Sequence, residues 1–258
     1  MKVDIAILDA AGAIGSNLCN YLVQHTKYQI VAYDSLSSGI NSLQKLAAAV
    51  NSRSRVQFYP LALNDRAFSK TLDIHQPQFV MGDLSKYSYT EIVELMCHLS
   101  VGTSVKKYVL SINYKHPELD KIKAFFKQDP LVVLVVAPTV FGTRASVGDF
   151  EVDAFLAATS LKVMEVSPDL QRWLYVKDYY NSMLMMMNFA PGVYELAITS
   201  LASQESILQM FRDFVVTGSG VLIEEPTQEQ GVVVPSSWGL SKLWEHTFLW
   251  YLENKWCR

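Results

Sequence analysis

Short apolar runs alternate with amphipathic stretches along most of the chain, a pattern typical of α/β folds with a parallel sheet. Strands are predicted at the apolar runs 5–8, 28–34, 56–59, 79–81, 106–111, 131–137 and 192–196. Helices are predicted at 15–24, 41–51, 66–72, 90–99, 118–128, 179–188 and 238–256. This alternation predicts a doubly wound parallel sheet with a small C-terminal lobe.

A glycine turn follows the first apolar run. It reads Asp9-Ala10-Ala11-Gly12-Ala13-Ile14-Gly15 and leads into the predicted helix 15–24. A strand, a glycine turn and a helix in this order place a dinucleotide pyrophosphate at the helix N-terminus in Rossmann-like folds. The candidate cofactor-binding residues of the turn are therefore Gly12, Ala13, Ile14 and Gly15.

An acid ends the second predicted strand. Asp34 stands 22 residues after Gly12, at the place where an acid accepts hydrogen bonds from the ribose hydroxyls of NAD. The alternative is that Asp34 only caps a turn. In the first case we expect any bound dinucleotide to be NAD rather than NADP.

These motifs resemble the extended branch of the short-chain dehydrogenase/reductase superfamily, the NAD-dependent sugar-nucleotide epimerases and dehydratases. Gly12, Ile14 and Gly15 match the T-G-x-x-G-x-I-G-S-x-L turn of dTDP-glucose 4,6-dehydratase-like and UDP-glucose 4-epimerase-like members. Further matches lie at 34–39, 138–144, 171–178 and 238–256. The resemblance implies a Rossmann-like NAD-binding-type domain at 1–145 and a small substrate lobe at 146–258, interleaved in one compact unit.

Departures from the family pattern weaken the implied cofactor site. Asp9 replaces the first glycine of the turn. At about 5 Å and an effective dielectric near 20, its charge would repel a phosphate by about 3 kcal/mol, which is about two decades of affinity. Ala62 replaces an acid that contacts adenine in the family, while Asp65 is retained as a predicted helix N-cap. Asp83 brings another carboxylate near the cofactor, so we expect weak NAD binding, which Asp9→Gly should strengthen.

The catalytic motif that the resemblance implies is incomplete. Ser111 and Lys123 stand at the family's catalytic serine region and at the lysine of its Y-x-x-x-K motif, but Leu119 replaces the proton-transferring tyrosine. Loss of a positioned general acid–base group forfeits roughly 10²–10⁴ in rate. Tyr114 and Asp83 are the only candidates for relocated acid–base groups. Lys123 is predicted to be a solvated helix lysine, with a ribose contact as the alternative.

Two arginines are the candidate substrate-binding residues. By resemblance, Arg144 and Arg172 would hold the diphosphate of a nucleotide sugar, since the guanidinium group suits paired phosphate contacts. The alternative for Arg172 is a surface ion pair with Asp178 or Asp169. The sequence contains no metal-ligating pattern, so no metal is expected.

Composition excludes several classes of partner. Of 258 residues, 50% are hydrophobic and 18% are charged, with a formal net charge of −3. Without a Lys/Arg run, no nucleic-acid partner is expected. The apolar run 131–141 is too short to span a bilayer, and because the N-terminus is predicted to enter a strand almost at once, no signal peptide is expected. Three scattered cysteines, Cys19, Cys97 and Cys257, fit a reducing cytoplasm.

Three functions compete on this evidence. The sequence favours a non-catalytic homologue of the epimerases and dehydratases that acts as a binding or structural protein. The alternatives are an active NAD-dependent nucleotide-sugar epimerase or 4,6-dehydratase with relocated acid–base groups, and a scaffold that binds no nucleotide. The resemblance implies a homodimer, or a larger assembly, built through the helices 90–100 and 118–128, and the apolar face on 90–99 agrees with this expectation.

Overall fold

The computed structural model describes residues 3–36, 46, 55–99, 105–143, 149–160, 163–198, 200–227, 231–233 and 238–254. The chain forms two compact units. The first contains Met1–Ala137 and Tyr180–Glu195, and the second contains Pro138–Tyr179 and Leu196–Arg258. The boundary near residue 145 that the resemblance implies stays a prediction.

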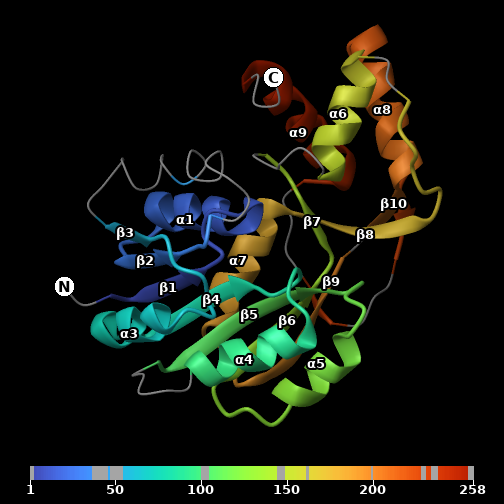
Figure 1. The fold of residues 1–258 in the computed structure, drawn as a ribbon. Helices are drawn as coiled ribbons and strands as arrows, with labels where there is room; N and C mark the ends of the chain where they lie inside the picture. Colours follow the sequence, from blue (N-terminus) through green and yellow to red (C-terminus); the bar gives the residue numbers. More distant parts are fainter. Residues whose placement is uncertain are drawn as a thin grey trace. The chain divides into compact units, whose positions relative to one another are not determined.

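The first unit contains the predicted parallel sheet (Figure 1). Seven strands follow the order β9-β6-β5-β4-β1-β2-β3, and all neighbours are parallel. They are β1 (Ile5–Leu8), β2 (Ile30–Tyr33), β3 (Val56–Tyr59), β4 (Phe79–Asp83), β5 (Lys107–Asn113), β6 (Val132–Ala137) and β9 (Gly192–Ala197). The strand order reverses beside β1, and ligands of such sheets bind outside the carboxyl ends of the strands at this switch point.

Helices cover both faces of this sheet. In Figure 1, α1 lies on one face, and α3, α4 and α5 lie on the other. Their bounds are α1 (Ala13–His25), α3 (Arg66–His75), α4 (Tyr89–Leu99) and α5 (Leu119–Phe126). Every residue of β6 is buried, which explains its uninterrupted apolar sequence. The predicted doubly wound α/β fold is confirmed.

Several predicted elements have different limits in the structure. The C-terminal helix is α9 (Leu240–Asn254), within the predicted 238–256. Helix α7 (Val176–Met186) begins before the predicted start at 179, because Asp178 lies in its first turn rather than ahead of it. The predicted helix 41–51 lies outside the described residues except for Leu46, which is helical and buried.

The second unit is built on a four-stranded sheet in the order β11-β10-β8-β7. The strands are β7 (Thr139–Phe141), β8 (Leu170–Tyr175), β10 (Ser200–Ser203) and β11 (Glu225–Pro226), and the short β12 (Val232–Val233) pairs with the last two residues of β9. Besides α9, its helices are α6 (Phe150–Ser160) and α8 (Gln204–Thr217). Aromatic side chains fill the core, where Phe141 stacks on Trp244 with ring centroids 3.9 Å apart.

The sequence pattern does not predict α6, although it is a regular helix. Its apolar residues form an uninterrupted run over 154–158 instead of recurring every three or four positions, so the sequence shows no helical period there. Among the described residues, no helix has the length and apolar composition needed to cross a membrane.

Candidate functional site

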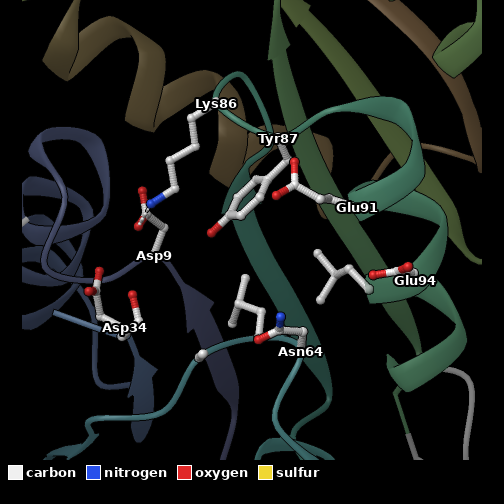
Figure 2. Close-up of a pocket in the computed structure, with 11 residues that line it drawn as sticks. Asp9, Asp34, Asn64, Lys86, Tyr87, Glu91 and Glu94 are labelled. Carbon is white, nitrogen blue, oxygen red and sulfur yellow. Dashed lines mark hydrogen bonds and ion pairs between the residues drawn. The ribbon is translucent and has the colours of Figure 1, made fainter. Parts of the chain in front are cut away.

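A pocket of about 370 Å³ lies in the first unit at the switch point of the sheet (Figure 2). Four carboxylates line it. Asp9 follows β1, Asp34 follows β2, and Glu91 and Glu94 lie on α4. Among the lining residues that the structure describes, Lys86, which follows β4, contributes the one ammonium group. The pocket therefore offers far more negative than positive charge to a ligand.

The remaining lining is apolar, aromatic or neutral. Leu63, Leu95 and Ala62 supply apolar surface, and Asn64 supplies an amide. The phenol ring of Tyr87 projects into the pocket between the acids (Figure 2). Burial raises the pKa of Tyr87, and the nearby carboxylates raise it further. Tyr87 is therefore a neutral hydrogen-bonding group at physiological pH.

The predicted cofactor-binding residues of the glycine turn come together at the start of α1. Gly12 is the N-cap, and Ala13 and Ile14 are the first helical residues. Gly15 is buried, and a Cβ added there would lie 2.1 Å from the backbone oxygen of Asp9. Only glycine permits this close approach of the helix to the turn.

Asp9 fills space beside this helix N-terminus. Its backbone has a φ of 53°, in the left-handed region. A Cβ added at Gly12 would lie 2.7 Å from Asp9 Oδ2, so the carboxylate lies against the bare face of Gly12. Lys86 Nζ donates a hydrogen bond to Asp9 Oδ1 and forms an ion pair with it. Burial raises the pKa of Asp9, Lys86 opposes that rise, and Asp34 adds to it.

The ion pair corrects one expectation from the sequence. The repulsion estimated for Asp9 treats its carboxylate as an isolated charge, but Lys86 neutralises much of that charge. The obstacle to a phosphate is also steric, because the carboxylate occupies the side of Gly12 that a pyrophosphate approaches in Rossmann-like folds. The residues of this turn do not fit a dinucleotide pyrophosphate in the arrangement that the structure shows.

Asp34 is tied to the backbone of the pocket wall. Its side chain is buried, with Oδ2 accepting a hydrogen bond from Ala11 N at 2.9 Å and Oδ1 accepting one from Leu36 N at 2.6 Å. The capping role is thus present. Each carboxylate oxygen retains a further lone pair, so a contact with a ribose hydroxyl stays a prediction.

The other predicted residues of this pocket differ in position. Ala62 lines the pocket. By resemblance, it stands at the position of the family's adenine-contacting acid. Asp65 is the N-cap of α3, where its side chain accepts a hydrogen bond from Ala67 N at 2.8 Å. The N-cap prediction is confirmed.

The catalytic remnant Ser111 is engaged with the proposed relocated acid Asp83. Ser111 is fully buried in β5, and its Oγ donates to Asp83 Oδ1 at 2.7 Å. Ser85 Oγ donates to the same oxygen at 2.8 Å. Burial raises the pKa of Asp83, while these two hydrogen bonds lower it. The structure therefore joins both residues in a hydrogen-bonded cluster at the ends of β4 and β5.

The second remnant, Lys123, is not a simple solvated lysine. Its Nζ lies 2.5 Å from Glu195 Oε1, and its side chain is 28% exposed. Leu119, at the family's tyrosine position, begins α5 and packs partly buried against the core. Tyr114 follows β5, where its backbone N–H donates to Ala137 O at 2.9 Å and the Lys115 ammonium lies 5.6 Å from its ring centroid.

Of the two predicted substrate-binding arginines, the structure describes Arg172. Arg144 lies outside the described residues. Arg172 lies in β8 of the second unit, opposite Leu201 of β10, and is half-buried. Their roles toward a nucleotide sugar stay predictions.

Sequence reasoning missed Lys86, Tyr87, Glu91 and Glu94. They follow β4 or lie on α4, where the sequence resembles no cofactor motif of the family. One signal was available, because loops at the carboxyl ends of parallel strands beside a switch point form the ligand site in such folds. Within the described residues no group of three or more potential metal ligands occurs.

Comparisons with known proteins give matches at the level of structure alone. No protein-family model matches the chain, and no curated protein matches it significantly. The dTDP-glucose 4,6-dehydratase of Bacillus anthracis, solved with NAD, is similar at a TM-score of 0.74 and 14% identity, covering 98% of this chain and 97% of that one.

Two other enzymes are equally similar. UDP-glucuronic acid 4-epimerase from Bacillus cereus, solved with UDP-glucuronic acid and NAD, has a TM-score of 0.76 at 13% identity over 97% of this chain and 99% of that one. The Bordetella bronchiseptica enzyme WbmF, solved with NAD⁺ and UDP, has a TM-score of 0.74 at 16% identity over 98% and 93%. The chain therefore has the Rossmann-like fold of the NAD-dependent sugar-nucleotide epimerases and dehydratases, as the sequence resemblance predicts.

Proposed function

We propose that this protein is a pseudoenzyme, a non-catalytic homologue of the NAD-dependent nucleotide-sugar epimerases and dehydratases that acts by binding or assembly. One observation carries the proposal. Leu119 stands at the position of the proton-transferring tyrosine, and a leucine side chain can neither give nor take a proton.

The surviving polar groups support the same conclusion. Catalytic serine and lysine groups must reach substrate or cofactor, but Ser111 donates to Asp83 and Lys123 pairs with Glu195. Both partners compete with any ligand for these groups. As a relocated base, Asp83 would have one oxygen, Oδ1, already accepting hydrogen bonds from two serine hydroxyls. Within the described part of the chain, the remnants Ser111 and Lys123 are therefore engaged by Asp83 and Glu195, which disfavours the alternative of an active enzyme.

The pocket is proposed as the retained ligand site. Similar enzymes are solved with NAD, UDP or UDP-glucuronic acid, which supports a nucleotide-related ligand here. Any NAD would bind weakly, with Asp34 as the candidate ribose contact, because Asp9 fills the phosphate side of the turn. Any nucleotide sugar would depend on Arg144 and Arg172.

Assembly and location complete the proposal. Helices α4 and α5 would form a homodimer interface, since Tyr89 of α4 packs edge-to-face on Phe125 of α5, which remains 37% exposed. A single species of monomer mass in sedimentation at micromolar concentration would contradict the dimer. A cytoplasmic location is proposed because Cys19 is buried and Cys97 is exposed, and neither forms a disulfide with a described residue.

The central test is turnover. Purified protein is incubated with NAD and with UDP-, dTDP- and GDP-sugars, and products are separated by mass and chromatography. We expect no 4-keto or epimerised sugar above a control without protein. Product that disappears in Tyr114→Phe or Asp83→Asn would show that the acid–base groups have moved and would refute the proposal.

A further inference from the structure

We infer that the pocket binds an unphosphorylated nucleoside more tightly than a nucleotide. The reason is that the Asp9 carboxylate, paired with Lys86, already occupies the phosphate-binding position at the glycine turn and the N-terminus of α1. The inference rests on the proposed function, since it names the ligand class of the same non-catalytic pocket. It reverses the preference expected of a dinucleotide fold.

Asp9 already occupies the anion-binding position at the start of α1. A helix N-terminus with a glycine turn attracts an anion through its free backbone N–H groups and the helix dipole. At the start of α1 an anion of the chain itself is already present, because Asp9 Oδ2 lies against Gly12 where a Cβ would be 2.7 Å away. A phosphate must displace this carboxylate before it can approach the turn.

Lys86 is paired with Asp9 and is therefore not available to a phosphate. Its ammonium pairs with Asp9 Oδ1, and the two side chains are 48% and 19% exposed, so Lys86 covers the more buried carboxylate from the solvent side. An unpaired lysine here would attract phosphate. The pair instead presents no net positive charge, and three further carboxylates among the described lining residues, Asp34, Glu91 and Glu94, face the same pocket. Each added phosphate therefore lowers affinity by like-charge repulsion.

The size and the lining of the rest of the pocket suit a nucleoside. Its volume of about 370 Å³ lies at the lower end of the range of small-molecule sites, roughly 300–1,000 Å³. Leu63, Leu95 and the Tyr87 ring offer apolar and aromatic surface for a base, while Asp34 and Asn64 offer acceptors and a donor for a sugar (Figure 2). A neutral base joined to a hydroxylated ring satisfies both parts.

The test is the order of affinities within one ligand series. Dissociation constants of adenosine, AMP, ADP and NAD are measured by calorimetry for the natural protein, Asp9→Asn and Asp9→Gly. We expect adenosine to bind the natural protein at least about tenfold more tightly than ADP or NAD. Asp9→Gly should invert that order, because it removes the carboxylate from the glycine turn and leaves Lys86 available to a phosphate.

Asp9→Asn separates charge from volume. Asparagine tolerates the left-handed backbone and keeps the side-chain volume, so phosphates should regain only part of their affinity. Asp120→Asn, an exposed acid on α5 outside the pocket lining, is the matched control and should leave the order unchanged. Circular dichroism of each variant establishes that it is folded.

Three results would overturn the inference. They are tighter binding of ADP or NAD than of adenosine by the natural protein, no change of order in folded Asp9→Gly, and no binding of adenosine at all. Turnover of a nucleotide sugar would instead refute the proposed function, so the two failures are distinguishable.

Discussion

Lys123 Nζ lies 2.5 Å from Glu195 Oε1, in an ion pair that ties α5 to β9. By resemblance, Lys123 is the lysine of the Y-x-x-x-K motif, which in active relatives lowers the pKa of the tyrosine and holds a ribose. In this chain Leu119 stands at the tyrosine position, and Lys123 instead pairs with Glu195 of β9.

The first prediction concerns the worth of this ion pair. Lys123→Met should lower the free energy of unfolding by no more than about 1 kcal/mol, because both side chains are partly exposed and solvent screens the pair. Urea denaturation measures the loss, with Lys121→Met in the exposed pair with Glu118 as the control. A tenfold or greater loss of affinity for a pocket ligand in Lys123→Met would show that Lys123 contributes to ligand binding.

The second prediction concerns Ser111. Ser111→Ala leaves Asp83 with one fewer donor and should cost about 1–3 kcal/mol of unfolding free energy. The folded-state pKa of Asp83 lies above its ordinary 3.8, so this acid destabilises the fold as pH rises above that value. Losing Ser111 raises the pKa further, and the cost should therefore be larger at neutral pH than near pH 4. An equal cost at both pH values would argue against this coupling.

The third prediction concerns Glu151 in the second unit. Its side chain is buried, and burial is the main cause that raises its pKa from 4.5 to about 8. The unfolded chain releases this proton near pH 4.5 and the folded chain only near pH 8, so stability falls as pH rises between these values. Glu151→Gln should remove that decline, on the order of 5 kcal/mol at its upper end.

Thermal or urea unfolding across this pH range measures the Glu151 effect. Asp153→Asn, on the same helix, is the control and should retain most of the decline. A pH dependence that is identical in Glu151→Gln and in the natural protein would show that Glu151 ionises normally.

The fourth prediction concerns the glycine turn. Gly15→Ala should destabilise the first unit by at least roughly 1–3 kcal/mol, because its Cβ would meet Asp9 O at 2.1 Å and Ala10 Cα at 2.8 Å, and backbone atoms cannot yield as a side chain can. Gly239→Ala is the matched control, since nothing lies within 4 Å of a Cβ there. Equal midpoints of unfolding for the two variants would contradict the close packing.

The sequence by itself determined the local features. The apolar runs marked the strands, the helical period marked α1, α3 and α4, and Asp65 was identified as an N-cap from its type and place. These features depend on residues close in sequence, so their physical cause is visible in a short window. The glycine spacing likewise indicated the Rossmann-like fold, which similar solved structures confirm.

Only the tertiary structure decided which charges meet. Asp9 and Lys86 are 77 residues apart, Lys123 and Glu195 are 72 apart, and Ser111 and Asp83 are 28 apart. A parallel sheet brings together the carboxyl ends of strands that are distant in sequence, and no local pattern records which side chains then lie within hydrogen-bonding distance. Asp9 could therefore be recognised from the sequence as a departure from a motif, but its partner, and the space that it fills beside Gly12, depend on the order of β1 and β4 in the folded sheet.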